Sequence, residues 1–384
     1  MVAGAAPPKQ NPAPVVPASR IADSGRSRSS RSPRRILVPP GARPRSAPTR
    51  PLNVTAIWRL LVVSAAVLAL GACGGQEPVD PQSPEDGGAE EGGDADGELT
   101  QIDVAFVPAT TGVLLNVAEK EGFFEKHGLD AELTDADNIS DVIPTLGQQF
   151  DISLGTSTDL IRAAEAGLDV VQISGNTIST KDNPFARLIV NGEADIEDIT
   201  DLEGRRMASP TPSGVINMAV RYWAQQEGLQ RGAIEVVQVP PPNHPDQLNA
   251  GQVDASQALE PFASQLLGAG HESLGNPFAA IRLPLATNFW VAQGQWAEEN
   301  PEVVESFRDA LADAQQFMAD SEENEDRARE ILADFTGMPR PIAQDVALPT
   351  FDLEVRTEDL ATWVEVLQEL DELDTDVDTD ELVR

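Results

Sequence analysis

The sequence predicts an α/β fold arranged in two similar lobes, and three observations carry this prediction. Across residues 101–384, short β-like apolar runs alternate with segments of helical periodicity. The alternation pauses after the apolar run at 186–192 and then restarts. The stretches "LGQQFDIS" and "AGQVDAS" echo each other and place Asp151 and Asp254 at matching points, 103 residues apart. Two such units predict two lobes built alike, with a ligand cleft between them.

The first unit opens with a β-like run at 102–108, followed by a helix over 110–128. Its apolar side chains, among them Leu114 and Leu115, fall on one face, and Gly128 is a suitable terminator. The other elements expected in this unit are strands at 130–135, 150–155 and 169–175 and helices at 139–149 and 157–167.

The second unit repeats the alternation, and the chain then returns through a strand at 287–293 to a helical tail. In that tail, apolar residues over 303–318 recur at steps of three and four, which predicts an amphipathic helix. A second such helix is expected over 357–370. The elements expected inside the second unit are strands at 205–210, 233–240 and 253–259 and helices at 213–228, 244–251 and 261–270.

The only cysteine, Cys73, directly follows an apolar run of 13 residues from Leu60 to Ala72. The run is too short for a membrane-spanning helix, which needs about 20 residues, but suits the core of an export signal, and Arg59 supplies the preceding positive charge. The letters "LGAC", formed by the end of this run and Cys73, resemble the lipobox of bacterial lipoproteins, which implies lipidation of Cys73. The alternative is an ordinary buried cysteine at a helix end.

Charge divides the rest of the chain. Residues 1–53 carry ten basic residues and one acid and lack apolar periodicity, so we expect residues 1–72 to be a disordered basic leader plus the signal, with Val54 a candidate for the true start. Residues 73–100, rich in Gly, Pro and acids, are expected to form a flexible tether. The part from Cys73 onward has a net charge of −46, which argues against nucleic acid as a partner.

Four segments in order resemble a known family. They are "AEKEGFFEKHGLDAEL", "TLGQQFDISLGTSTDLIRAAEAGLDVV", "DITDLEGRRMASP" and "LNAGQVDASQALEPF". Together they are similar to the extracytoplasmic substrate-binding proteins of ABC importers, in the branch that serves nitrate, alkanesulfonates, taurine and thiamine-pyrimidine precursors.

The resemblance implies a two-lobed periplasmic-binding-protein-like fold (type II), each lobe a mostly parallel sheet flanked by helices, with a helical C-terminal tail. It places two crossovers near 184–192 and 280–288. The expected boundaries are lobe 1 at 101–187 and 285–384 and lobe 2 at 188–284.

Three junctions, each at the carboxyl end of a strand and before a helix, carry the small residues that a ligand site at this edge of a sheet needs. Free backbone N–H groups and the helix dipole there favour an anion or an oxygen-rich group. The alternative for each Ser or Thr is a simple helix cap. The candidate ligand contacts at the junctions are Thr110, Thr111, Gly112, Thr156, Ser157, Thr158, Thr211, Ser213 and Gly214.

Other candidates follow neighbouring strands. Glu260 would contact the ligand or serve the hinge, and Trp290 would stack on a planar ligand or pack in the core. Asn288 is a further candidate on the return strand, and Thr177, with Asn176, follows the fourth strand of the first unit. Basic residues available as counter-charges lie outside the three junctions: Arg162, Lys181 and Arg187.

No catalytic motif is recognisable, and we expect no enzyme activity, no cofactor and no metal. The three histidines, His127, His244 and His271, are expected at the surface. The resemblance implies a monomeric, lipid-anchored protein on the outer face of the cell membrane that delivers a small molecule to permease subunits. Two alternatives are a lipoprotein that signals to a membrane kinase and a thiamine-pyrimidine synthase-like enzyme, the latter disfavoured because that enzyme uses a cysteine-rich motif.

Overall fold

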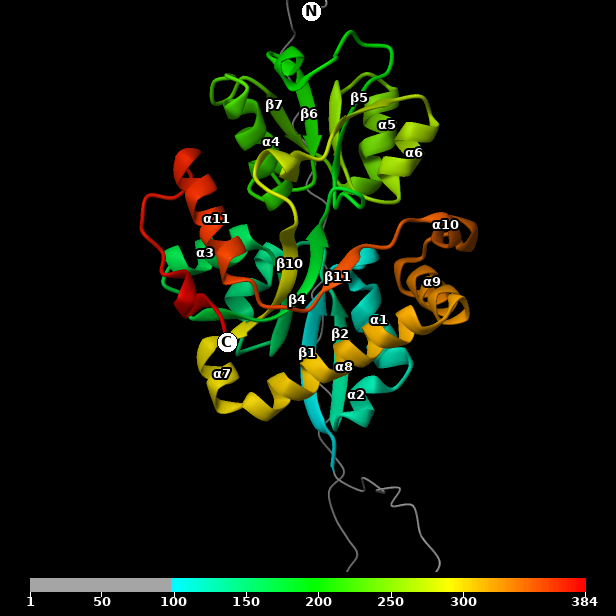
Figure 1. Cartoon of the computed structure of the whole chain (residues 1–384), viewed down its shortest axis with the longest axis vertical. Coiled ribbons are helices and arrows are strands. Elements are labelled where there is room, and N and C mark those ends of the chain that lie inside the picture. The colour runs from blue at the N-terminus through cyan, green and yellow to red at the C-terminus, as the bar shows by residue number, and fades with distance from the viewer. Residues whose placement is uncertain (1–97) are drawn as a thin grey trace, which may run out of the picture. The chain divides into compact units, whose positions relative to one another are not determined.

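The computed structural model describes residues 98–384, which are built on two separate β-sheets (Figure 1). We call the part around the six-stranded sheet lobe 1 and the part around the five-stranded sheet lobe 2. The strand orders are β11-β4-β10-β3-β1-β2 in lobe 1 and β7-β6-β8-β5-β9 in lobe 2. The predicted leader, Cys73 and most of the predicted tether lie outside the described residues.

The strands divide between the lobes as follows. Lobe 1 holds β1 (Thr100–Phe106), β2 (Leu129–Asp135), β3 (Ile152–Gly155), β4 (Val170–Ser179), β10 (Leu285–Gln293) and β11 (Thr350–Asp352). Lobe 2 holds β5 (Arg187–Val190), β6 (Arg206–Ser209), β7 (Glu235–Gln238), β8 (Ala255–Ala258) and β9 (Glu272–Gly275).

Most helices belong to lobe 1. These are α1 (Val113–Lys120), α2 (Phe123–Lys126), α3 (Ser157–Glu165), α7 (Gly294–Glu299), α8 (Pro301–Asp320), α9 (Glu322–Thr336), α10 (Arg340–Asp345) and α11 (Thr357–Glu369). Lobe 2 has α4 (Val215–Gln226), α5 (His244–Asn249) and α6 (Phe262–Gly268). Short 3-10 turns are η1 (Thr110–Gly112), η2 (Ile139–Asp141), η3 (Ile143–Thr145), η4 (Ile199–Leu202), η5 (Pro241–Asn243), η6 (Pro277–Ala280) and η7 (Thr379–Leu382).

The α/β class is as predicted, and the strand pairing is mixed in both sheets. β1 pairs in parallel with β2 and β3, and β6 pairs in parallel with β7 and β8. The strands that flank the two connections between the sheets pair antiparallel with their neighbours, as β10 does with β3 and β5 does with β8. Each lobe therefore has a parallel core of three strands, extended by antiparallel strands, of which β10 in lobe 1 and β5 in lobe 2 enter from the other lobe.

The sequence echo around Asp151 and Asp254 marks a structural repeat. The Asp151 carboxylate accepts the backbone N–H of Asp103 on β1 at 2.9 Å, and Asp254 accepts the N–H of Arg206 on β6 at 2.9 Å. In each case the aspartate N–H also donates back to the carbonyl of the same strand residue. The two residues of each pair are 48 positions apart in the sequence. The same reciprocal hydrogen bonds therefore join β1 to the start of β3 in lobe 1 and β6 to the start of β8 in lobe 2.

Two expected helices of lobe 1 are interrupted. The helix expected over 110–128 ends at Lys120 and resumes at Phe123, because Gly122 adopts a left-handed conformation with φ of 75°. The helix expected over 139–149 forms only two 3-10 turns, η2 and η3. Pro144 explains the second difference, since proline has no N–H to donate and its ring clashes with the preceding turn.

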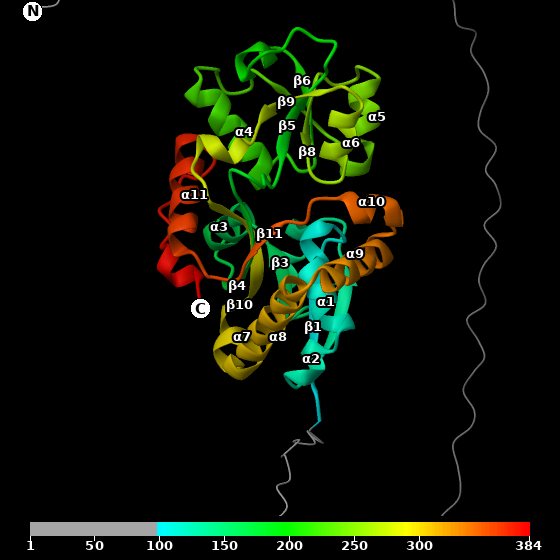
Figure 2. The same cartoon turned by 45° about the vertical axis from the view of Figure 1, so that its right-hand side comes forward.

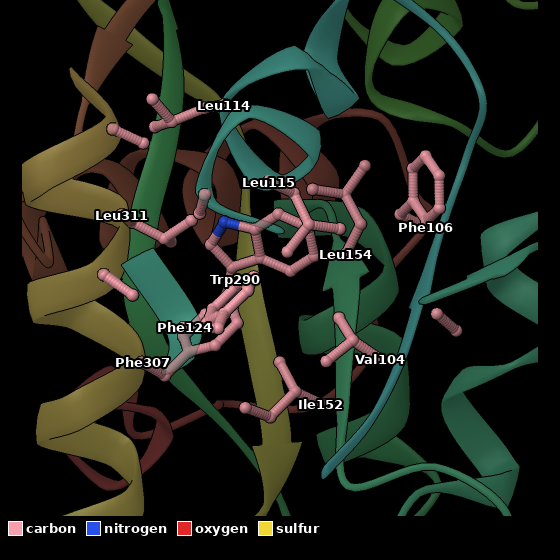
Figure 3. Close-up of a cluster of buried hydrophobic side chains, with 14 of the residues drawn as sticks. Val104, Phe106, Leu114, Leu115, Phe124, Ile152, Leu154, Trp290, Phe307 and Leu311 are labelled. Atoms are coloured by element: carbon pink, nitrogen blue, oxygen red, sulfur yellow. The ribbon is translucent and has the colours of Figure 1, made fainter. Parts of the chain in front are cut away.

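Lobe 1 has an aromatic core beneath the long helix α8. Trp290 on β10 and Phe307 on α8 pack edge to face with ring centroids 5.5 Å apart. Phe124 of α2 stacks on the same Phe307 at 5.7 Å. Figure 3 shows these three rings surrounded by aliphatic side chains of α1 and β3, including Leu115 and Leu154. The core packs α8, which follows the second lobe in the sequence, against α1, α2 and β3, which precede it. It therefore holds this C-terminal helix to the first sheet.

Helix α11 lies against both lobes. Its Trp363 and Leu367 belong to a buried cluster that also contains Ile161 of α3 in lobe 1 and Met218 of α4 in lobe 2. Figure 2 shows α11 beside both of these helices. The cluster is apolar throughout, so α11 is a packed bridge between the lobes.

Glu372, three residues after the end of α11, adds ion pairs to the apolar contacts of this bridge. Its carboxylate bonds Arg162 of lobe 1 at 3.2 Å and Arg221 and Arg231 of lobe 2 at 2.8 Å each. Burial acts to raise the pKa of Glu372, but the hydrogen bonds and charges of Arg221 and Arg162 outweigh burial and lower the pKa. The ionised carboxylate therefore links side chains of the two lobes.

Candidate functional site

A cavity of about 1380 Å³ is lined by residues of both lobes. Its walls include the loops that follow β1, β2 and β3 in lobe 1 and β6, β7 and β8 in lobe 2. These are the carboxyl ends of all six parallel-paired strands, where α/β folds place their ligands. The segment from the end of α9 to β11, residues 336–350, contributes a further wall.

Seven of the sequence-predicted contacts line this cavity. Thr110 and Thr111 reach it from η1, and Gly214 is the N-cap residue of α4. The full set is Thr110, Thr111, Thr156, Thr211, Gly214, Glu260 and Asn288.

Five other predicted contacts do not line the cavity. Ser157 and Thr158 are buried in the first turn of α3, and Thr177 is buried in the sheet on β4. Gly112 packs against the Phe106 ring so closely that a Cβ atom would lie 2.7 Å from it. Ser213 is exposed at the surface of its loop. A strand-to-helix junction of four residues turns only part of its side chains toward the cavity, and sequence spacing did not show which.

Trp290 requires a correction. Its side chain is fully buried in the lobe 1 core against Phe307, and it is absent from the residues that line the cavity. The pairing of β10 with β4 shifts register between Asn288 and Phe289, so the regular alternation of side chains does not carry from Asn288 to Trp290. Trp290 therefore packs in the core, which was the alternative to stacking on a ligand.

Asn288 is held in place by buried polar groups. Its Oδ1 accepts a hydrogen bond from the Asn176 side chain at 2.8 Å and one from the Thr177 hydroxyl at 2.9 Å. Asn176 also donates to the Thr111 carbonyl at 3.0 Å. Asn176 and Thr177 therefore position Asn288 and the η1 loop, although neither lines the cavity.

The junction before α3 forms a second polar network. Both Asp159 carboxylate oxygens accept hydroxyl hydrogen bonds at 2.6 Å, one from Ser140 and one from Thr156. Thr156 is also the N-cap of α3 and accepts the Asp159 N–H through its side chain. All three residues line the cavity, so a carboxylate with fixed orientation is presented there.

Sequence reasoning missed several lining residues. The loop after β2 supplies Asn138 and Ser140, whereas the sequence predicts a helix from residue 139 and no contact in this loop, although "DADN" has the composition of a turn. Met338, Ile342 and their neighbours come from the C-terminal tail, where no sequence pattern connects them to the cavity.

A family model described as the NMT1-like family matches residues 95–333. The chain belongs to the NMT1-like family. It is 22% identical over 271 residues to the nitrate/nitrite binding protein NrtA of Synechocystis, a match that covers 62% of this chain and 57% of that protein. This NMT1-like chain thus matches little more than half the length of that curated relative.

Solved structures show the same fold for this NMT1-like chain. The periplasmic nitrate-binding protein NrtA of Synechocystis superposes with a TM-score of 0.63 at 15% identity, over 75% of this chain and 86% of that one. The periplasmic aliphatic sulphonate binding protein SsuA of Escherichia coli gives a TM-score of 0.62 at 17% identity, over 74% and 97%. The chain has the periplasmic-binding-protein fold.

The basic residues considered as counter-charges in the NMT1-like chain lie elsewhere. Arg162 bonds Glu372, and neither Lys181 nor Arg187 is among the residues that line the cavity. Among the described residues that line it, none is lysine, arginine or histidine. The polar groups that a solute would meet are hydroxyls, amides and carboxylates.

The histidine prediction is wrong for His244. Its ring is buried and bonds the Ser256 hydroxyl at 2.8 Å and the Val239 carbonyl at 2.9 Å. Burial lowers the pKa of His244, and the bond to Val239 opposes this only in part. His244 therefore ties α5 to β8 as a neutral side chain within lobe 2 of the NMT1-like chain.

Proposed function

We propose that this chain is the extracytoplasmic solute-binding component of an ABC importer, which captures a small molecule in the cavity between its lobes and delivers it to membrane permease subunits. The observation that carries the proposal is the cavity itself, lined from both lobes at the carboxyl ends of six strands, in a chain of the NMT1-like family. The relatives named above are binding proteins by description, which supports binding rather than catalysis.

The bridge made by α11 fits this role. Because Trp363 and Leu367 pack against both lobes on one side, the lobes are coupled there, and the cavity is lined by segments of both. A solute that contacts Thr156 in lobe 1 and Thr211 in lobe 2 would link the two walls and favour a closed arrangement. Such closure would give the permease a means of distinguishing loaded from empty protein.

We further propose that Cys73 carries a lipid that anchors the protein to the outer face of the membrane. The support is the apolar run of 13 residues from Leu60 to Ala72, whose end forms the letters "LGAC" with Cys73. Among residues 98–384, no helix is both long and apolar enough to cross a bilayer. Metabolic labelling with a radioactive fatty acid tests the anchor: Cys73→Ser should lose the label, and Ser64→Ala, which keeps the cysteine, should retain it. Label retained in Cys73→Ser would refute the anchor.

A thermal-shift screen tests the binding function. The panel contains nitrate, alkanesulfonates, taurine, pyrimidines, flavins and organic amines, and we expect at least one to raise the melting temperature, because a ligand that binds only the folded state stabilises it. Thr211→Trp should abolish that shift, since Thr211 lines the cavity. Ser213→Trp is the matched control, because Ser213 is exposed two residues away and does not line it.

Two results would count against the proposal. Absence of a shift with every solute of the panel would remove the solute-binding role. Equal shifts in the wild type and Thr211→Trp would move the binding site away from this cavity. Loss of binding in Ser213→Trp as well would show that the substitution damages the loop, and Thr110→Trp in lobe 1 would then take its place.

A further inference from the structure

We propose, on the basis of the binding function above, that the solute is an organic cation with a mostly apolar body, and that the cavity discriminates against oxyanions such as nitrate and sulfonates. The charge of the cavity wall, the positions of its carboxylates and the absence of cationic side chains among the described lining residues support this assignment.

The wall of the cavity is acidic. Its charged residues are all carboxylates, namely Asp137, Asp159, Glu260 and Asp345. Asp137 in the loop after β2, Asp159 in α3 and Asp345 in α10 belong to lobe 1, and Glu260 belongs to lobe 2, so both lobes contribute negative charge to the wall. An anion that enters would meet repulsion from several directions, whereas a cation would find an opposite charge.

Two of these carboxylates occupy equivalent junctions of the repeat. Asp159 lies in the first turn of α3, after β3, and Glu260 lies just before α6, after β8. Glu260 accepts the N–H of Ser264 at 3.2 Å, and Asp159 accepts the hydroxyls of Ser140 and Thr156. The start of a helix is where backbone N–H groups would otherwise hold an anion. In both lobes the protein supplies its own carboxylate there.

Three arginines near the lining segments are committed to other carboxylates. Arg162 and Arg221 bond Glu372, and Arg340 of α10 pairs with Glu330 and Asp334. None of these arginines is among the residues that line the cavity. A bound oxyanion would therefore lack the cationic donors that balance its charge.

Much of the remaining wall is apolar, and its neutral polar groups are hydroxyls and amides. Ten prolines line the cavity, and proline contributes no backbone N–H. Phe185, Phe262 and Met338 add apolar side chains, and Ile342 of α10 lines it with 45% of its surface exposed. An apolar body gains by contact with such a surface, whereas the charge of an oxyanion would find no cationic side chain there among the described residues.

One feature of the cavity favours an acceptor group. Helix α4 begins at Gly214 with no acid in its first turn and no side-chain cap. The partial positive charge of a helix start is about half an elementary charge, which is less than one carboxylate. This junction suits a neutral oxygen of the solute, such as a carbonyl or hydroxyl, beside its cationic nitrogen.

The test uses three planar molecules of one size and three charges: benzamidine, benzamide and benzoate. Calorimetry with the full protein should show benzamidine bound at least about 10-fold more tightly than benzoate, with benzamide between them. Asp159→Asn should weaken benzamidine at least about 5-fold and leave benzamide within about 2-fold. Asp326→Asn, a substitution on α9 away from the cavity lining, is the control and should change none of the three.

The outcomes separate this inference from the proposed function. Tighter binding of benzoate, nitrate or an alkanesulfonate than of any cation would overturn the inference and leave solute binding in place. The inference also fails, with solute binding intact, if benzamide binds best and Asp159→Asn has no effect on any probe. If no probe of either panel binds, the inference and the proposed function fall together.

Discussion

The two lobes share one topology but are stabilised by different cores. The lobe 1 cluster contains the buried rings of Phe106, Phe124, Trp290 and Phe307, and the long helix α8 supplies the last of these. Within the described part of the chain, the two buried clusters confined to lobe 2 contain only aliphatic, alanine and methionine side chains. Aromatic side chains bury the largest areas. We therefore expect lobe 1 to be the more stable scaffold and lobe 2 to depend more on its neighbours.

The support for lobe 2 comes from a cluster that belongs to neither lobe alone. Phe278, Trp363 and Leu367 pack there against Met218 and Ala219 of α4. Asp359 of α11 adds polar bonds to the second connection, with the Ala286 N–H at 2.7 Å and with Arg282. The C-terminal helix thus adds aromatic and aliphatic contacts to lobe 2 that the clusters confined to lobe 2 lack.

The largest effect is expected from truncation in the two cores. Trp290→Ala should lower the free energy of unfolding by about 4 kcal/mol and Leu248→Ala, in lobe 2, by about 3 kcal/mol, because each leaves a cavity among fully buried neighbours. Urea unfolding followed by circular dichroism measures both. If Leu248→Ala lowers the free energy of unfolding more than Trp290→Ala does, the expectation that lobe 1 has the stronger core is wrong.

A smaller effect is expected at the bridge. Glu372→Gln should cost about 2 kcal/mol at neutral pH, since it removes an ionised acceptor shared by Arg162, Arg221 and Arg231. The folded pKa of Glu372 lies below its ordinary value of 4.5, so this stability is present above that pH and is lost as the pH falls.

The difference between wild type and Glu372→Gln should therefore shrink on acidification below about pH 4.5. The exposed Glu365 of α11 provides the control, and Glu365→Gln should change the free energy of unfolding by less than about 0.5 kcal/mol. A difference that stays constant from pH 7 to pH 3 would show that the carboxylate charge does not stabilise the bridge.

The smallest effect tests the repeat itself. Asp151→Ala and Asp254→Ala should each cost about 1 kcal/mol, because each removes a hydrogen bond to a strand N–H, and the partly exposed pair of Asp254 with Arg205 at 3.7 Å adds little. The two losses should agree within about 0.5 kcal/mol if the residues are equivalent. Chemical denaturation at pH 7 is the measurement, and a loss at only one of the two positions would show that the echo is not an energetic repeat.

Much of the fold could be predicted from the sequence because it depends on local patterns. The alternation of strands and helices, the restart of the second unit and the match between Asp151 and Asp254 all follow from periodicity and spacing. The break of the expected helix at 139–149 could also have been predicted from the sequence, since Pro144 interrupts it. For the site, the sequence predicted which strand-to-helix junctions lie at the cavity, because topology determines which strand ends meet there. It did not predict which side chains of each junction line the cavity.

What the sequence by itself determined is the α/β order, the two-fold repetition and the strand-to-helix junctions, since these depend on neighbours within a few residues. Only the tertiary structure decided which junction side chains face the cavity. Thr156 and Thr211 line it, whereas Thr177 and Trp290 are buried and Ser213 is exposed. It alone brought α10 and its prolines to the cavity and placed α11 across both lobes. These contacts join residues more than 100 positions apart, and no local pattern carries that information.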